Sequence, residues 1–181
     1  IADTNLRGVV ARALGIPITG GWNGMPIVSR PIFATDMATL TTLDAGSRDI
    51  LDLTGLEYAV NLQTLNLANN FISDLSLLTP GVKIGHEREG QLGLDKLEFL
   101  ALDGNPIEDS DLPDLAKLTS LKGLSLDYTL LTTLDRDRNP TTVQDSLGAL
   151  KNLEFLSVDA GRKLDVFSSF VVQTAGTYYI E

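Results

Sequence analysis

Leucine and other apolar residues recur along the chain in one pattern, L-x-x-L-x-L-x-x-N-x-I, in which x is any residue. The clearest copy occupies residues 62–72, and residues 97–107 fill every key position again. A third copy starts at Leu121, and weaker copies start at Leu40 and Leu153. Five copies indicate a repeat protein, in which each unit buries its apolar side only against the next unit.

Within each copy, the L-x-L core alternates apolar and polar residues, as a short strand with one buried face does. The following asparagine turns the chain, and its amide can satisfy backbone groups that a tight turn leaves unpaired. Successive copies start 22, 35, 24 and 32 residues apart. Because 22 residues leave no room for a long helix, we expect 3₁₀ or irregular turns opposite the strands, with insertions near residues 80–95 and 134–146.

Residues 62–78 resemble the internalin-like class of bacterial leucine-rich repeats, and residues 50–58 resemble the outer segment of the same unit one coil earlier. The resemblance covers residues 40–164. It implies an α/β fold, a right-handed leucine-rich-repeat solenoid of about five coils over residues 36–166, with a short parallel sheet on one face. It also implies recognition without specifying a target. In three copies another residue replaces the asparagine of the pattern: Arg48, Thr129 and Gly161. These replacements argue against an unbroken ladder of asparagines.

The ends of a solenoid need caps, because terminal coils would otherwise expose core side chains. Residues 3–15 predict an amphipathic helix with Asp3 or Thr4 as N-cap and Gly15 at its end. Its apolar face is expected to contain Leu6, Val9, Val10, Ala13 and Leu14. With an irregular connector, this helix makes residues 1–35 the predicted N-terminal cap; the alternative is a helix that binds a partner.

Residues 167–181 contain two β-prone runs, 167–174 and 177–180, separated by Ala175 and Gly176. This pattern predicts a β-hairpin. Two interpretations stay open. The hairpin caps the solenoid, or it begins a following β-sandwich domain, since the segment resembles strands of immunoglobulin-like modules in bacterial surface proteins.

Side chains at the third, fifth and seventh positions of the repeat point onto the open face of the sheet. Equivalent positions on neighbouring strands lie about 4.8 Å apart and stack into ladders. The seventh position of the last three copies holds Asp103, Asp127 and Asp159. Because like charges across strands destabilise a sheet, this row suggests a strip that attracts a partner's cation or a metal. The alternative is that these aspartates are ordinary solvated turn residues.

Further side chains complete the candidate binding surface. Phe99 and Phe155, at the third position, would add aromatic area typical of interface anchors, unless the insertions cover them. The fifth position holds Asn66, Ser125 and Ser157. We therefore expect a protein partner, favoured by charge to be basic, or a glycan.

Composition narrows the choice of partner. The formal net charge is −10, from 24 acidic and 14 basic side chains, and this charge repels nucleic acid and anionic lipid. No apolar stretch approaches the roughly 18 residues of a membrane-spanning helix, so membrane insertion is not expected. The absence of cysteine excludes disulfides and thiol chemistry. No signal peptide is visible, so an export signal and further domains would lie outside this sequence.

A calcium site is a weak candidate. Asp135, Asp137 and Asn139 have the D-x-D-x-N spacing that opens an EF-hand-type loop. However, Pro140 and Ser146 stand where that loop has glycine and glutamate. A solvated polar loop is the favoured interpretation, with calcium-dependent stabilisation as the alternative.

The sequence gives little indication of a catalytic site. The single histidine, His86, lies in a polar insertion, and no nucleophile elbow, zinc-binding helix or phosphate loop occurs. We expect no enzyme and no cofactor. The sequence predicts a non-catalytic recognition module of an exported or cell-surface bacterial protein, with a structural spacer of a larger surface protein as the alternative.

Overall fold

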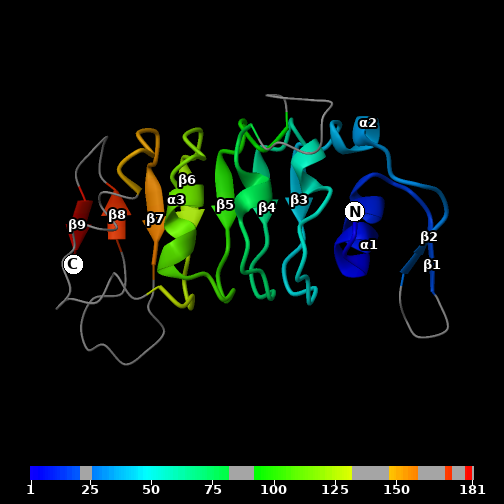
Figure 1. Ribbon diagram of the computed structural model, residues 1–181, viewed down its shortest axis with the longest axis horizontal. Coiled ribbons are helices and arrows are strands. Elements are labelled where there is room, and N and C mark those ends of the chain that lie inside the picture. Colours follow the sequence, from blue (N-terminus) through cyan, green and yellow to red (C-terminus); the bar gives the residue numbers. More distant parts are fainter. Residues whose placement is uncertain (21–25, 82–91, 132–146, 159–169, 173–177, 181) are drawn as a thin grey trace.

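Five short parallel strands follow one another along the molecule in chain order (Figure 1). They are β3 (Thr42–Asp44), β4 (Thr64–Asn66), β5 (Phe99–Ala101), β6 (Gly123–Ser125) and β7 (Phe155–Ser157). This computed structural model describes residues 1–20, 26–81, 92–131 and 147–158, together with the strands at 170–172 and 178–180. The predicted solenoid with a parallel sheet on one face is confirmed.

Equivalent repeat positions lie side by side across the whole sheet. The central leucine of each strand pairs with the central leucine of the next, in the order Leu43, Leu65, Leu100, Leu124 and Leu156. These five leucines are buried. The register therefore follows from the repeat itself, because a shift of one residue would turn every apolar side chain outward.

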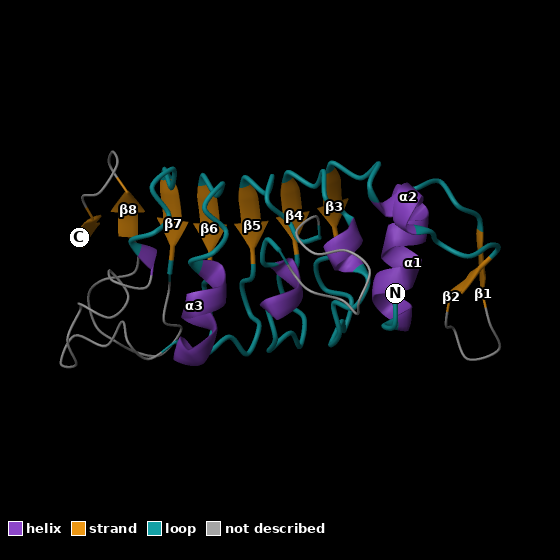
Figure 2. Ribbon diagram, turned by 45° about the horizontal axis from the view of Figure 1, so that its top comes forward, coloured by secondary structure: helices purple, strands orange, loops and turns teal. Residues whose placement is uncertain are grey.

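In the described residues, the side of the coils opposite the sheet consists of short turns rather than long helices (Figure 2). Its elements are η1 (Leu56–Tyr58), η2 (Ser76–Leu78), η3 (Asp109–Asp111) and α3 (Leu112–Leu115). The 22-residue step between β3 and β4 contains only the 3₁₀ turn η1, as predicted. Most of the two predicted insertions lies outside the described residues.

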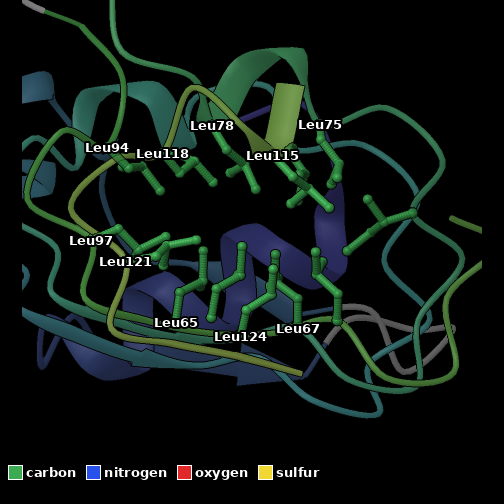
Figure 3. Close-up of a cluster of buried hydrophobic side chains, with 14 of the residues drawn as sticks. Leu65, Leu67, Leu75, Leu78, Leu94, Leu97, Leu115, Leu118, Leu121 and Leu124 are labelled. Carbon is green, nitrogen blue, oxygen red and sulfur yellow. The ribbon is translucent and has the colours of Figure 1, made fainter. Parts of the chain in front are cut away.

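The core fills the space between the sheet and these turns (Figure 3). Leucines from the strands, such as Leu65 and Leu124, point toward leucines from the turns, such as Leu78 and Leu115. All four are almost completely buried. Each fully buried leucine contributes about 1.5–3 kcal/mol, so stacking the coils provides the main stabilisation.

Two buried asparagines join neighbouring coils at the turn that follows the strand. The side-chain oxygen of Asn70 accepts hydrogen bonds from the N–H groups of Arg48 and Ile50 in the preceding coil, both at 3.0 Å. Its amide nitrogen donates to the carbonyl of Ala45 at 2.9 Å. Asn105 accepts one such bond, from the N–H of Ile72 at 3.0 Å, and donates to the carbonyl of Leu67 in the coil before it at 2.8 Å. The predicted role of asparagine is confirmed.

This ladder stops at the fourth coil, where Thr129 replaces asparagine. Its hydroxyl donates only to the carbonyl of Leu126 in its own coil, at 2.8 Å. The N–H of Ile107, which corresponds to the N–H of Ile50, donates instead to the carbonyl of Asn105 at 2.8 Å. The ladder is therefore discontinuous, as the departure at Thr129 predicts.

The N-terminal helix α1 (Thr4–Ala13) lies against the first coil (Figure 1). The Asp3 carboxylate caps it by accepting from the N–H groups of Asn5 and Leu6 at 2.8 and 2.9 Å. The prediction that Ala13 is buried is wrong: Ala13 is exposed, and Ala11 is buried instead.

The reason is a second neighbour of α1, which the sequence did not predict. The strands β1 (Ile18–Gly20) and β2 (Pro26–Val28) pair antiparallel, and β2 packs against the helix. Gly8 allows this approach, since a Cβ there would lie 2.7 Å from Pro26 Cγ. Ala11 follows Gly8 by three residues and shares its face. The predicted irregular connector is thus partly wrong, because it also contains the short helix α2 (Ala34–Met37).

The C-terminal strands β8 (Phe170–Val172) and β9 (Tyr178–Ile180) pair antiparallel, as a hairpin requires. β8 lies beside β7 at the end of the solenoid (Figure 1). Both interpretations of this segment, a cap or the start of a further domain, stay predictions.

Asp36 in α2 offers a pH-dependent test of the N-terminal region. Hydrogen bonds from Arg30, at 2.7 and 2.9 Å, and from the Phe33 N–H, at 2.8 Å, lower the pKa of Asp36 from 3.8 to about 2. A lowered folded-state pKa stabilises the protein above the unfolded-state pKa, and this contribution disappears as the pH falls toward 2. We expect Asp36→Asn to lower the melting temperature at pH 7 but to match the parent near pH 2. Thermal melts of both proteins between these pH values check this; a difference independent of pH would contradict it.

Candidate functional site

Two exposed phenylalanines dominate one end of the open sheet face. Phe99 on β5 is 48% exposed and Phe155 on β7 is 53% exposed. The alternative that the insertions cover these rings concerns segments that lie mostly outside the described residues. Gly123 lies between them in the register of the sheet. A Cβ at Gly123 would lie 2.7 Å from Phe99 Cδ1, so the glycine provides the room for the Phe99 ring over β6.

The aspartates at the seventh position are bound to the next strand. The Asp103 carboxylate accepts from the Ser125 hydroxyl and, at 2.9 Å, from the N–H of Asp127. Ser157 donates to both carboxylate oxygens of Asp127, at 2.9 Å each. These hydrogen bonds give Asp103 and Asp127 a structural role, so the row of charges does not by itself require a cationic ligand.

Asn66 takes part in the same kind of contact two strands away from β6. Its amide nitrogen donates to Asp44 at 2.8 Å, and its side-chain oxygen accepts from the N–H of Ala68 at 3.0 Å. Asn66 is half-buried, whereas Asp44 is exposed. The polar residues of the face thus form bonds between strands, and these bonds hold the side chains in defined positions.

Charged residues at the second repeat position border the aromatic pair, and the repeat pattern did not single them out. Lys122 forms an ion pair with Glu98 at 2.9 Å. Glu154 is exposed one coil further on. Each of these residues directly precedes a third-position residue, and this adjacency is the signal that could have revealed them.

The structure therefore brings most of the predicted site residues together on the face of β5, β6 and β7. Phe99 and Phe155 provide apolar area, and Ser125, Ser157 and the aspartates provide hydrogen-bonding groups. Asn66 lies on the adjacent strand β4. Asp159 lies outside the described residues. An exposed apolar area beside polar groups that are held in place is typical of a surface that binds another molecule.

The remaining candidates cannot be placed on this face. Asp135, Asp137 and Asn139, the weak calcium candidate, and His86 lie outside the described residues. Within the described part of the chain, no three His, Cys, Asp or Glu side chains form a group that could hold a metal ion. The helices of that same part are all too short or too polar to cross a membrane.

No protein-family model matches the chain, and neither does any curated protein. Solved structures do. An internalin of Listeria monocytogenes (inlF) has a TM-score of 0.56 and 21% identity over 87% of this chain and 43% of that chain. A second Listeria internalin (inlC2) has a TM-score of 0.50 and 25% identity over 87% and 64%. The SNF/U2A' complex of Drosophila melanogaster has a TM-score of 0.50 and 20% identity over 81% and 80%. This chain spans less than two thirds of either internalin.

Proposed function

We propose that this chain, an internalin-like leucine-rich-repeat solenoid, is a recognition module that binds a protein partner through the open face of its sheet. The observation that carries the proposal is the pair of exposed rings, Phe99 and Phe155, on either side of Gly123. Large aromatic side chains on the same open surface are typical binding anchors.

The surface is also held rigid before a partner arrives. The rings project from paired strands, and the serines fix the carboxylates of Asp103 and Asp127 from the next strand. Binding to a preorganised surface costs less conformational entropy than binding that orders flexible loops. This supports specific recognition on a face that needs no rearrangement.

The charge of the same face favours a basic partner. Asp103 and Asp127 lie at one end of the strands and Glu98 and Glu154 at the other, with Lys122 as the basic side chain among them. A partner with lysine or arginine around an apolar residue would complement this arrangement. The resemblance of residues 40–164 to bacterial internalin-like repeats supports an exported or cell-surface location and a non-catalytic role.

The test compares parent and variant against the same binders. Fragments that bind the parent are selected from a displayed library of natural protein segments, and their affinity is then measured for the double variant Phe99→Ala, Phe155→Ala. We expect the affinity to fall at least about tenfold, since truncating two interface anchors costs more than about 1 kcal/mol each.

Phe33→Ala is the matched control, because Phe33 is 58% exposed but lies outside the sheet. It should leave the affinity unchanged. If the selected fragments bind the double variant as tightly as the parent, the open face is not the binding site, and the spacer alternative gains support.

A further inference from the structure

A second exposed apolar surface lies at the turn that follows the strands. The tenth repeat position holds Phe71, Pro106 and Leu130 in three consecutive coils. We call these three residues the turn ridge. Phe71 is 57% exposed and Leu130 is 44% exposed. Tyr128, two residues before Leu130, is also exposed.

The backbone of the turn explains why the ridge points outward. The eighth position has a positive φ in each of these coils: 55° at Asn69, 65° at Gly104 and 57° at Tyr128. The chain reverses there, and the eleventh-position residue then enters the core. The N–H groups of Phe71 and Leu130 donate to Ile50 and Ile107 of the preceding coils, both at 2.9 Å, so both ridge residues have the same register.

The fold itself does not require apolar residues on this ridge. Coil 1 also has a positive φ at its eighth residue, 56° at Ser47, but its exposed tenth residue, Asp49, has a positive φ of 54° as well, so its turn differs from the others. Phe71 and Leu130 are largely exposed rather than packed in the core, so core packing does not require them to be apolar. The geometry of the coil therefore does not explain why Phe71, Pro106 and Leu130 are apolar.

The surroundings of the ridge are strongly acidic. Position ten lies between positions seven and thirteen of a coil, and aspartates occur at both. We call these two sets the acidic rows: Asp103 and Asp127 at position seven, and Asp52, Asp74 and Asp109 at position thirteen. Segments 46–52, 68–74, 103–109 and 127–131 contain seven acidic residues against one basic residue, Arg48. The acidic residues are Asp49, Asp52, Asp74, Asp103, Glu108, Asp109 and Asp127. Hydrogen bonds from Ser76 lower the pKa of Asp74, so this side chain stays charged near neutral pH.

We propose that the turn ridge is the docking site for a basic amphipathic helix of a partner protein. Apolar side chains of that helix would pack on Phe71, Pro106 and Leu130, and lysines or arginines on both flanks would face the acidic rows. A helix fits the spacing, because its turns rise about 5.4 Å and the coils repeat about every 4.8 Å. Alternate residues of an extended segment lie about 6.6 Å apart, which does not match the coils.

The negative charge around the turn ridge argues against two other binding partners at this site. A second copy of this chain would bring its own acidic rows against these, and an anionic lipid surface would be repelled in the same way. Asp103 and Asp127 border both surfaces, but the apolar residues of the turn ridge are not those of the open sheet face. Substitutions of the apolar residues therefore let the proposed function and this proposal fail independently.

The test uses a synthetic helical peptide of leucine and lysine, about 18 residues long, with leucine at i, i+3, i+4 and i+7. Fluorescence anisotropy measures its binding to the full chain. Phe71→Ser combined with Leu130→Ser should weaken binding at least about tenfold. The double variant Phe99→Ala, Phe155→Ala should bind the peptide like the parent.

Two controls separate the ridge from simple charge attraction. A peptide of the same composition in scrambled order should bind at least about tenfold more weakly than the amphipathic one. Phe71→Asp adds a negative charge and removes the ring, so it weakens binding if the ridge is the site and strengthens binding if charge alone is responsible. Unchanged melting temperatures establish that the variants fold.

Three results would overturn the proposal. They are no binding of the amphipathic peptide, equal binding of the scrambled peptide, and equal binding to the ridge variants. If only the Phe99 and Phe155 variant lost binding, the peptide would bind at the open sheet face. That outcome would contradict the proposal for the turn ridge and support the proposed function.

Discussion

Replacing Asn105 by alanine is expected to lower the free energy of unfolding by about 3–5 kcal/mol, because several buried groups lose their partners at about 1–3 kcal/mol each. The side-chain oxygen of Asn105 accepts from the N–H of Ile72 at 3.0 Å, and its nitrogen donates to the carbonyls of Leu67 and Leu102 at 2.8 and 3.0 Å. These hydrogen bonds are buried between coils, and alanine can replace none of them. Urea denaturation followed by circular dichroism measures the loss.

The matched control is Asn152→Ala. Asn152 is exposed and donates one hydrogen bond to the carbonyl of Thr119, at 3.0 Å. Its replacement should change the free energy of unfolding by less than about 0.5 kcal/mol. Asn105→Thr should fall between the two, because Thr129 occupies the same position one coil later with a single bond. Equal losses for Asn105→Ala and Asn152→Ala would contradict the proposed importance of the buried amide.

Truncation of a central leucine should have a comparable effect. Leu100 is 3% exposed and lies between Leu65 and Leu124 in the sheet. Leu100→Ala removes apolar contacts and leaves a cavity in the middle coil, which costs about 2–5 kcal/mol. Since each coil is stabilised by its neighbours, a weak middle coil should also reduce cooperativity. A broader unfolding transition, with a lower dependence on urea, would report this.

Leu51→Ala is the control for this prediction, because Leu51 is 66% exposed. The same chemical change there should alter stability by less than about 0.5 kcal/mol. If both leucine variants unfold at the same urea concentration, the stacked core is not the main source of stability.

The sequence alone determined the architecture of the coils. Alternation along a strand decides which side chains face the core, so the repeat pattern by itself assigns Leu62, Leu65 and Leu67 to the interior, where all three are buried. The repeat also determined the register, since equivalent leucines align. Local hydrogen-bonding capacity narrowed the N-cap to Asp3 or Thr4 and indicated the role of Asn70; the structure identifies Asp3 as the cap. These features depend on residues close together in the chain or on an exact repeat.

Only the tertiary structure decided how the coils interact across the surface. The bond from Ser125 to Asp103 and the position of the Phe99 ring over Gly123 each join residues more than twenty positions apart. The burial of Ala11 instead of Ala13 depends on a hairpin whose short strands carry no strong local pattern. The repeat pattern indicates which side of its coil a residue lies on. The residues that it contacts belong to the neighbouring coil, and only the stacking of the coils determines which residues these are.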